Sequence, residues 1–557
     1  MRTELLLLLL ACSGPSEQPV DGGSVDGGST DGGATDGGST DGGGTDGGTT
    51  DGGGTDGGTS GDGGGEPDPQ ARSCGLQTDL PDPWLWEGEE LRFTVSCGGE
   101  LPTEEALFTA VGLPEGASFD PATRTLAWTT GASDGGTWSL NVAVTDGGFE
   151  GAFPVIETVT VWVADNPDLA DARRVDPLEY TEEWGLPVVH VDTRPSIGTE
   201  YQAATIIFDG VELPGQIKIR GASSAYYDKP GYTLEFDEEE IDVPWGSDSR
   251  DHLLLVSTFD DNSHVRQKLV YDQWAAIAEY WGQPRLAPRS FFAVLYLNGS
   301  YQGLFLALDR IDNEFVRQMG FDDSGNLYKA VNHEANFYAT GTSGAAKSWL
   351  ADGYTKEEGE PESDFSDLEA LIGFTSSSSP SELWAEADDW IRREEFIDWF
   401  LLVSFSLAQD SAGKNSYLYH EPVLDQFLYC PWDFNSSWGQ SWYTSRTSSA
   451  SVDDYTWANR VFWAFQDDAE AEAELWDRFR AMRADGPFAK AWLLARLDAY
   501  EAEIRPSALR DEAKWQAAYR SYWWAGYRSD WTDWEGEMSY LRTWISEREL
   551  VFEGLAP

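Results

Sequence analysis

A five-residue repeat between residues 21 and 60 most constrains what this chain can fold into. Most copies read Asp-Gly-Gly followed by two small residues, and the repeat contains no apolar side chain larger than that of Val25. A segment with nothing to bury cannot offset the conformational entropy lost on folding. We therefore predict a disordered tether over residues 13–73. As a Gly-rich coil, about forty residues would span roughly 35 Å root-mean-square, enough to hold a folded domain away from a surface.

The residues before the repeat have the form of an export signal. A short charged start is followed by six leucines, from Leu5 to Leu10, which are too few to span a bilayer, and then by Ala11 and Cys12. Residues 9–12, Leu-Leu-Ala-Cys, resemble the bacterial lipoprotein box, in which the cysteine is acylated and becomes the new N-terminus. We predict a lipoprotein signal peptide over residues 1–12 and lipidation of Cys12. The protein is then exported and anchored to a membrane, in the periplasm or at the cell surface; an ordinary signal peptide with an incidental cysteine is the alternative.

The charge of the chain limits its partners. Its 557 residues include 97 Asp and Glu against 37 Lys and Arg, a formal net charge of −60, which repels phosphate backbones and excludes a nucleic-acid partner. The hydrophobic fraction of 41% is nevertheless enough to build large cores, and the length favours two or three domains. None of the five histidines stands at a zinc-ligand spacing from another, which argues against a zinc enzyme with histidine ligands.

The first folded region is predicted over residues 74–165. Alternating runs at residues 91–95, 125–128 and 138–144, separated by Asp, Gly and Pro turns, predict an all-β antiparallel sandwich. Residues 112–120, 126–128 and 142–146 resemble the immunoglobulin-like domains common in bacterial surface proteins. Export favours a Cys74–Cys97 disulfide, whereas Cys430 lies in an apolar run and is predicted to be a buried thiol. The Asp residues of this region could bind calcium as in cadherin-like modules, but solvated surface charge on a spacer is the preferred explanation.

The second folded region is predicted over residues 180–557. Strand-like runs occur at residues 188–191, 206–208, 217–219, 232–236 and 291–297, a helix is predicted over residues 265–281, and the chain is predominantly helical after residue 384. This order predicts a bilobal α+β domain with a helical C-terminal part. Residues 390–407 are predicted to form a buried helix.

Three residues after that helix have the spacing of a phosphotransferase site. Asp410 is followed by Asn415, by a predicted hairpin at residues 416–420 and 426–430, and then by Asp433. Phosphoryl transfer needs a carboxylate to orient the attacking hydroxyl and oxygen ligands to hold Mg²⁺. In protein kinases, a loop Asp is followed five positions later by an Asn ligand and, after a short stretch, by a second Asp ligand. In so Asp-rich a chain the spacing alone also arises by chance, with turn and capping residues as the simpler explanation.

The surrounding sequence resembles the CotH kinase family, secreted or spore-coat proteins with a divergent protein-kinase-like fold. The resemblance covers most of the chain from about Pro187. It lies in five blocks: residues 220–224 (Arg-Gly-Ala-Ser-Ser) with Lys229 and 232–234; 253–255 with 260–261 and 266–269; 298–305 with 309–312; 325–329; and 410–415 with 432–439.

The resemblance implies an atypical protein kinase that transfers phosphate from ATP, bound with Mg²⁺ or Mn²⁺, to hydroxyls of a protein substrate whose identity the sequence does not give. It implies that Asp410 is the catalytic residue and that Asn415 and Asp433 are the metal ligands. The candidates for the nucleotide phosphates are Arg220, Ser223, Ser224, Lys229 and Lys329. A kinase-like site needs only one such lysine, and the sequence does not choose between the two; a solvated surface amine is the alternative for either.

Three residues depart from the family's pattern. Ala225 stands where a basic residue is frequent, Asp309 replaces a Glu, and Asn435 replaces an Asp that could supply a further metal ligand. Two other functions therefore stay open: an inactive kinase-like adhesin or coat protein, and transfer of a nucleotidyl group by the same site.

Two further patterns are given structural interpretations. Residues 341–348 differ from a P-loop at Ala346, and they lack the preceding hydrophobic strand and the following long helix. The Trp-rich stretch between Trp515 and Trp544 could suggest a carbohydrate platform, but its helical spacing favours core packing.

Overall fold

The computed structural model describes residues 72–555, with gaps at residues 81–82, 115, 132–133, 135, 149–153, 165–174, 195, 238–242, 245–250, 522–527 and 529. The predicted signal peptide, Cys12 and nearly all of the predicted tether lie outside the described residues. Among the helices that are described, none combines the length and the apolar character needed to cross a bilayer.

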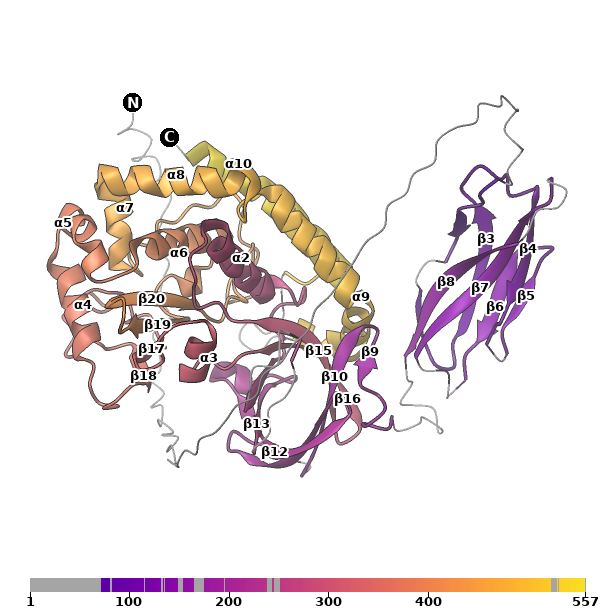
Figure 1. Cartoon of the computed structure of the whole chain (residues 1–557), viewed down its shortest axis with the longest axis horizontal. Coiled ribbons are helices and arrows are strands. Elements are labelled where there is room, and N and C mark those ends of the chain that lie inside the picture. Colours follow the sequence, from indigo (N-terminus) through magenta and orange to yellow (C-terminus); the bar gives the residue numbers. More distant parts are fainter. Residues whose placement is uncertain are drawn as a thin grey trace, which may run out of the picture. The chain divides into compact units, whose positions relative to one another are not determined.

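The first region is a sandwich of two four-stranded sheets (Figure 1). One sheet has the order β1 (Leu76–Thr78), β3 (Glu90–Cys97), β6 (Thr125–Thr129) and β5 (Ser118–Asp120); the other has β2 (Trp84–Trp86), β8 (Val155–Ala164), β7 (Gly136–Asp146) and β4 (Ala106–Val111). In β3 the buried Leu91, Phe93 and Val95 alternate with exposed residues, because successive strand side chains point to opposite faces. The predicted sandwich is confirmed, and its pairs are antiparallel except that β2 and β8 pair in parallel.

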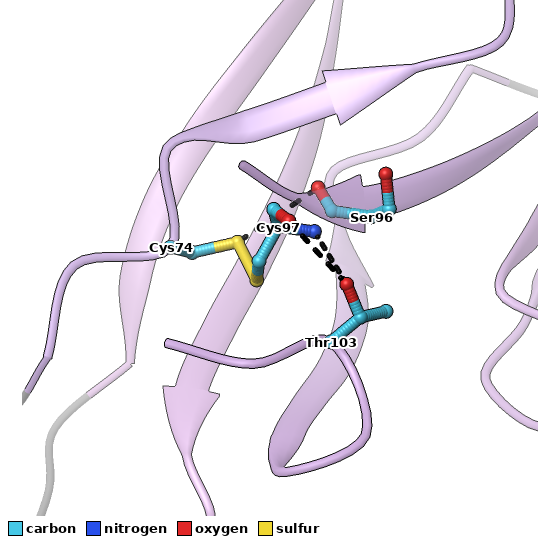
Figure 2. Close-up of a disulfide and its surroundings, with 4 residues drawn as sticks. All are labelled: Cys74, Ser96, Cys97 and Thr103. Atoms are coloured by element: carbon cyan, nitrogen blue, oxygen red, sulfur yellow. Dashed lines mark hydrogen bonds between the residues drawn. A yellow bond between two sulfur atoms is a disulfide. The ribbon is translucent and has the colours of Figure 1, made fainter. Parts of the chain in front are cut away.

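A disulfide joins Cys74 to Cys97 at the start of this sandwich, with the two Cα atoms 4.6 Å apart (Figure 2). The Cys97 backbone N–H donates to Thr103 Oγ1 (3.0 Å), and that hydroxyl lies 3.4 Å from the Cys97 carbonyl oxygen, to which it donates. Cys430 is a buried free thiol. Both cysteine predictions are confirmed.

The second region begins with an eight-stranded sheet that closes on itself. Its order is β11 (Gln202–Phe208), β12 (Val211–Arg220), β13 (Gly231–Phe236), β14 (His252–Val256), β16 (Ser300–Leu308), β15 (Ser290–Leu297), β10 (Leu186–Thr193) and β9 (Glu182–Glu183), and β11 also pairs with β10. The β10–β15 pair is parallel and the other pairs are antiparallel. Alternate residues such as Val189, Ile206, Leu234 and Leu255 form one buried cluster inside the closed sheet.

The opposite face of β10, β15 and β16 packs against helix α2 (Arg266–Trp281). Leu269 and Trp274 of this helix share a second core with Val294 and Leu306 of the strands. The same core continues into the helical part of the chain, so these strands are buried on both faces. The predicted helix over residues 265–281 is confirmed to within one residue.

The remainder is predominantly helical and surrounds a four-stranded antiparallel sheet (Figure 1). The sheet has the order β18 (Tyr354–Glu358), β17 (Asn326–Ala330), β19 (Ser416–Glu421) and β20 (Gln426–Pro431). The helices are α3 (Asn313–Gln318), α4 (Ser366–Ser377), α5 (Pro380–Ala385), α6 (Arg393–Ser406), α7 (Ala464–Asp467), α8 (Ala469–Asp485), α9 (Lys490–Arg520) and α10 (Trp534–Leu555), with short 3-10 turns η1 (Ser223–Tyr226), η2 (Ala387–Asp389), η3 (Gln409–Ser411) and η4 (Arg460–Trp463). A β-sandwich followed by a mixed β and helical domain is the fold class that the sequence predicted.

Helix α6 begins three residues later than the sequence pattern predicts. Ile391 forms a β-bridge with Phe427, and the Arg392 backbone N–H donates to the Phe427 carbonyl (3.2 Å). The chain before the helix is thus held extended against β20. The helix ends where Leu407 takes a left-handed conformation (φ 52°).

The two structural interpretations agree with the described residues. Trp534 and Trp544 are buried in the main core, while Trp523 and Trp524 lie outside the residues that the structure describes. Residues 341–348 form turns beside a Thr340–Ala346 bridge, and the next helix along the chain is α4.

Candidate functional site

The β19–β20 hairpin places Asn415 and Asp433 next to each other. Ser416 pairs with Pro431, so Asn415 and Trp432 face each other at the open end, where the Trp432 N–H donates to the Asn415 carbonyl (3.2 Å). Asp433 follows directly. Asn415 and Asp433 both have a φ of 56°, a left-handed conformation that Asn and Asp adopt more readily than most residues.

Asp410 lies in the turn η3, beside Asn415. Its Oδ2 accepts a hydrogen bond from Asn415 Nδ2 (3.0 Å), while its Oδ1 lies 3.0 Å from Lys414 Nζ and 3.4 Å from His333 Nε2. Burial alone would raise the pKa of Asp410, but the hydrogen bond from His333 and the charge and hydrogen bond of Lys414 outweigh burial and lower the pKa. Asp410 is therefore an ionised acceptor at neutral pH.

Asp433 presents an exposed carboxylate. Its backbone N–H donates to the Tyr271 hydroxyl (3.3 Å) and its carbonyl accepts from Ser411 Oγ (3.4 Å), but its carboxylate accepts no hydrogen bond from the residues that the structure describes. The closely surrounding protein and the charge of Asp410 raise the pKa of Asp433. Two neighbouring carboxylates that repel each other, one of which accepts no hydrogen bond from the described residues, favour a bound cation.

Two cationic side chains lie in the field of Asp433. Arg220 ends β12, with its guanidinium carbon 5.5 Å from the centre of the Trp432 ring. Lys329 lies in β17, with Nζ 5.4 Å from the Tyr417 ring and 5.8 Å from the Trp432 ring. Burial lowers the pKa of both groups. The charge of Asp433 raises the pKa of Arg220, whereas the charge of Glu357 and then that of Asp433 raise the pKa of Lys329.

Neither cationic group forms a hydrogen bond or an ion pair within the described part of the chain, although both side chains are half-buried. A half-buried cation that makes ring contacts but has no hydrogen-bonded counter-charge is costly. Arg220 and Lys329 together thus form a site prepared for an anion.

The loop after Arg220 carries the two predicted serines. Gly221 has a φ of +100°, and a Cβ there would lie 2.0 Å from Ser224 Oγ, so only glycine fits this turn. Ser223 is exposed, and the half-buried Ser224 accepts the Tyr227 N–H on its carbonyl (3.3 Å). The loop therefore starts at the anion site and presents the exposed Ser223, whose hydroxyl forms no hydrogen bond with the residues that the structure describes.

The structure does not bring Lys229 to this site. Its buried Nζ donates to Asp511 Oδ2 (2.5 Å), to the Leu304 carbonyl (2.6 Å) and to the Tyr519 hydroxyl (3.1 Å). An ammonium group has three donors, and all three are used here, so none is left for a phosphate. Lys329 is the predicted lysine that lies beside Asp433, and neither lysine is a solvated surface amine.

Two of the departures from the family's pattern have visible consequences. Asp309 is buried and pairs with Arg289 (Nε to Oδ2, 3.0 Å), while burial raises the pKa of Asp309 to about 6. Asn435 Nδ2 donates to Asp260 Oδ2, and burial together with the charge of Asp433 raises the pKa of Asp260 to about 6. An amide at position 435 thus avoids placing one more carboxylate against Asp260.

Three residues of the site were not singled out from the sequence: His333, Lys414 and Asp260. Lys414 and Asp260 lie inside two of the blocks that carry the family resemblance, next to Asn415 and Asp261. Their position in these blocks was the sequence signal that could have identified them. His333 has no such signal, because its contact with Asp410 arises only from folding.

The acceptors at the hairpin fit a magnesium ion. Among the described residues, no three His, Cys, Asp or Glu side chains gather closely enough to hold a metal alone. Mg²⁺, however, is usually held by one or two protein oxygens together with phosphates and water. The Asp433 carboxylate accepts no hydrogen bond in the described structure, and Asn415 uses its amide nitrogen on Asp410, which directs the amide oxygen elsewhere. One carboxylate and one amide oxygen therefore match the donor set.

A closed sheet and a helical part are joined by one core and carry an Asp–Asn–Asp set beside two cations that form no ion pair with the described residues. These features define a domain of the kinase-like class. Comparison with known families agrees: the family model "CotH kinase protein" matches residues 217–551, more than half of the chain. The chain belongs to the CotH kinase family. A second model, "Putative Ig domain", matches residues 78–161. The resemblances stated from the sequence are thereby confirmed.

One curated relative is the inner spore coat protein H of Bacillus subtilis (strain 168). It is 24% identical over 237 residues, which cover 42% of this chain and 62% of that protein. The chain thus spans less than two thirds of the length of this relative.

Proposed function

We propose that the CotH domain is a metal-dependent protein kinase that transfers the terminal phosphoryl group of ATP to a hydroxyl of another protein. The observation that carries this proposal is a pair of half-buried cations, Arg220 and Lys329, that lie in the electrostatic field of Asp433 and form no hydrogen bond or ion pair with the residues that the structure describes. An anion site beside an ionised Asp410 and two metal-type acceptors is what phosphoryl transfer requires.

Each residue has a distinct role in this proposal. Asn415 and Asp433 would hold Mg²⁺ or Mn²⁺, which neutralises charge on the phosphate oxygens when bound. Arg220 and Lys329 bind phosphate oxygens, and the Ser223 hydroxyl lies in the loop that follows Arg220. Asp410 orients the acceptor hydroxyl and takes its proton, while His333 and Lys414 keep Asp410 ionised.

A second function, that of an inactive coat component or adhesin, is favoured by the name of the relative, which is a spore coat protein. Nucleotidyl transfer is a third outcome, because the same anion and metal sites could accept a nucleotide in the reverse orientation. Product analysis separates the three: phosphoprotein, nucleotidyl-protein or neither.

Two point variants test the kinase proposal. Asp410→Asn keeps the side-chain volume and should leave Mg²⁺–ATP affinity nearly unchanged while lowering turnover by about 10²–10⁴-fold, the usual contribution of a positioned base. Asp433→Asn should weaken both nucleotide binding and turnover. Asp425→Asn is the matched control, since this exposed residue lies at the other end of the same hairpin. Full transfer activity in folded Asp410→Asn would refute the role of Asp410.

We also propose that the protein is exported and anchored through acylated Cys12. The Cys74–Cys97 disulfide supports export, since disulfides persist in oxidising compartments. Cys12→Ser should move the protein from the membrane fraction to the soluble fraction without changing its thermal unfolding, because the acyl chain supplies the membrane affinity. Unchanged membrane association would contradict the anchor.

A further inference from the structure

A buried ion pair fixes helix α9 to the strands of the closed sheet. Lys229 and Asp511 have 1% and 0% of their side chains exposed, and their charged atoms are 2.5 Å apart. They are separated by 282 residues in the chain. In Figure 1, α9 is the long helix that ends beside the sheet.

The pair is part of a fully engaged network. Asp511 Oδ2 also accepts the Leu304 N–H (2.7 Å), and Lys229 donates to the carbonyl of the same Leu304 (2.6 Å). The Tyr519 hydroxyl, two turns along α9, donates to Asp511 Oδ1. Gly303 has a φ of +120°, and a Cβ there would lie 2.2 Å from Asp511 Oδ2, so this strand position must be glycine for the carboxylate to dock.

The network also reaches the loop that leaves the anion site. That loop runs from Arg220 to Lys229, so Arg220 stands at one end and the α9 contact at the other. Within the loop, the Tyr227 ring stacks on Phe259 with centroids 4.8 Å apart, and Phe259 lies 5.2 Å from the ring of Tyr519. The Tyr227 hydroxyl donates to Asp260 (3.2 Å), which belongs to the candidate site.

We propose that Asp511 is a positioning residue for the phosphate-binding loop of residues 220–229. Asp511 binds Lys229 at one end of the loop, and it also holds Tyr519, whose ring contacts Phe259, the ring on which Tyr227 stacks. Helix α9 near the C-terminus thus fixes a loop that lies much earlier in the chain. Lys229 then serves the site by anchoring this loop, and it does not touch the nucleotide. The fixing of the loop is independent of catalysis, whereas its effect on nucleotide affinity rests on the proposed function.

Hydrogen–deuterium exchange of the full-length protein tests the proposal directly. Loss of a hydrogen bond to a charged group should raise exchange of residues 221–228 by about 10–100-fold in Asp511→Asn, with Mg²⁺–ATP affinity falling in parallel. Tyr519→Phe keeps the ring and removes only the hydroxyl, so a smaller change in the same direction is expected. Lys514→Ala is the matched control. This exposed residue of α9 donates to the carbonyl of Tyr301 in β16, the strand that also carries Leu304, but it forms no hydrogen bond with Lys229.

The outcomes separate positioning from general destabilisation and from failure of the proposed function. Exchange that rises in the loop but not in α6, with the control unchanged, supports the positioning role. Wild-type exchange over residues 221–228 in either folded variant overturns it, as does a rise spread evenly over the whole domain. If Asp511→Asn does not fold, Tyr519→Phe decides alone. If the wild-type protein binds no nucleotide, the proposed function fails while the exchange result still decides the role of Asp511.

Discussion

Replacing each of the two candidate lysines with methionine gives opposite predictions, because the structure assigns them different surroundings. The Lys329 ammonium has no hydrogen-bond partner among the described residues, and it shares the field of Asp433 with Arg220. Losing one charge-assisted hydrogen bond to a phosphate costs about 1.5–3 kcal/mol, so Lys329→Met should raise the Kd of Mg²⁺–ATP by about 10–150-fold. Its free energy of unfolding should not fall, since Lys329 forms no ion pair with the residues that the structure describes.

Lys229→Met should behave in the reverse way. It leaves the Asp511 carboxylate buried without its counter-charge, and breaking a buried ion pair from one side costs about 3–5 kcal/mol of stability. A smaller loss of nucleotide affinity should follow from the loosened loop.

Calorimetric titration with Mg²⁺–ATP and urea unfolding of the same preparations measure the two quantities. The reasoning is refuted if Lys329→Met binds ATP with wild-type affinity. It is equally refuted if Lys229→Met is as stable as the wild-type protein while its nucleotide binding is abolished, because Lys229 would then contact the nucleotide.

Three further predictions concern stability. Burial lowers the pKa of His264 to about 4, below the value near 6.5 in the unfolded chain. The stability that the neutral, buried His264 contributes is therefore fully present above pH 6.5 and is lost as the pH falls toward 4. The difference in unfolding free energy between His264→Gln and the wild-type protein should therefore change by about 3 kcal/mol between pH 6.5 and pH 4. A difference that stays the same at every pH would contradict this. Asp398→Asn should cost about 3–5 kcal/mol in urea unfolding, since it leaves the guanidinium groups of Arg285 and Arg478 without their buried carboxylate; a neutral result would contradict the pairing. Replacing Cys74 and Cys97 together by Ala should cost the sandwich about 3 kcal/mol, from the loop of 23 residues that they close, and an unchanged calorimetric transition would refute that.

Local patterns in the sequence were sufficient for the individual elements. The period-two alternation in β3 and the helical period of residues 265–281 each depend on neighbours along the chain, and both elements form where predicted. The hairpin that joins Asn415 to Asp433 is local as well, which is why their spacing already pointed to one site.

The closure of the sheet and the choice between the lysines could not be predicted in this way. The pairing of β11 with both β12 and β10 depends on which strand edges come together in the folded sheet. Helix α6 begins late because Ile391, just before it, pairs with Phe427 of β20. Lys229 and Lys329 look alike in the sequence, each being a lysine near a strand.

The sequence by itself determined the order of sandwich and kinase-like domain, the family, and the Asp410–Asn415–Asp433 set, because composition, periodicity and short spacings are properties of neighbouring residues. Only the tertiary structure decided that Lys329 lies beside Asp433 with no ion pair among the described residues, while Lys229 is neutralised by Asp511. The availability of a charged group depends on what lies within a few ångströms in space, and for Lys229 that partner comes from 282 residues away.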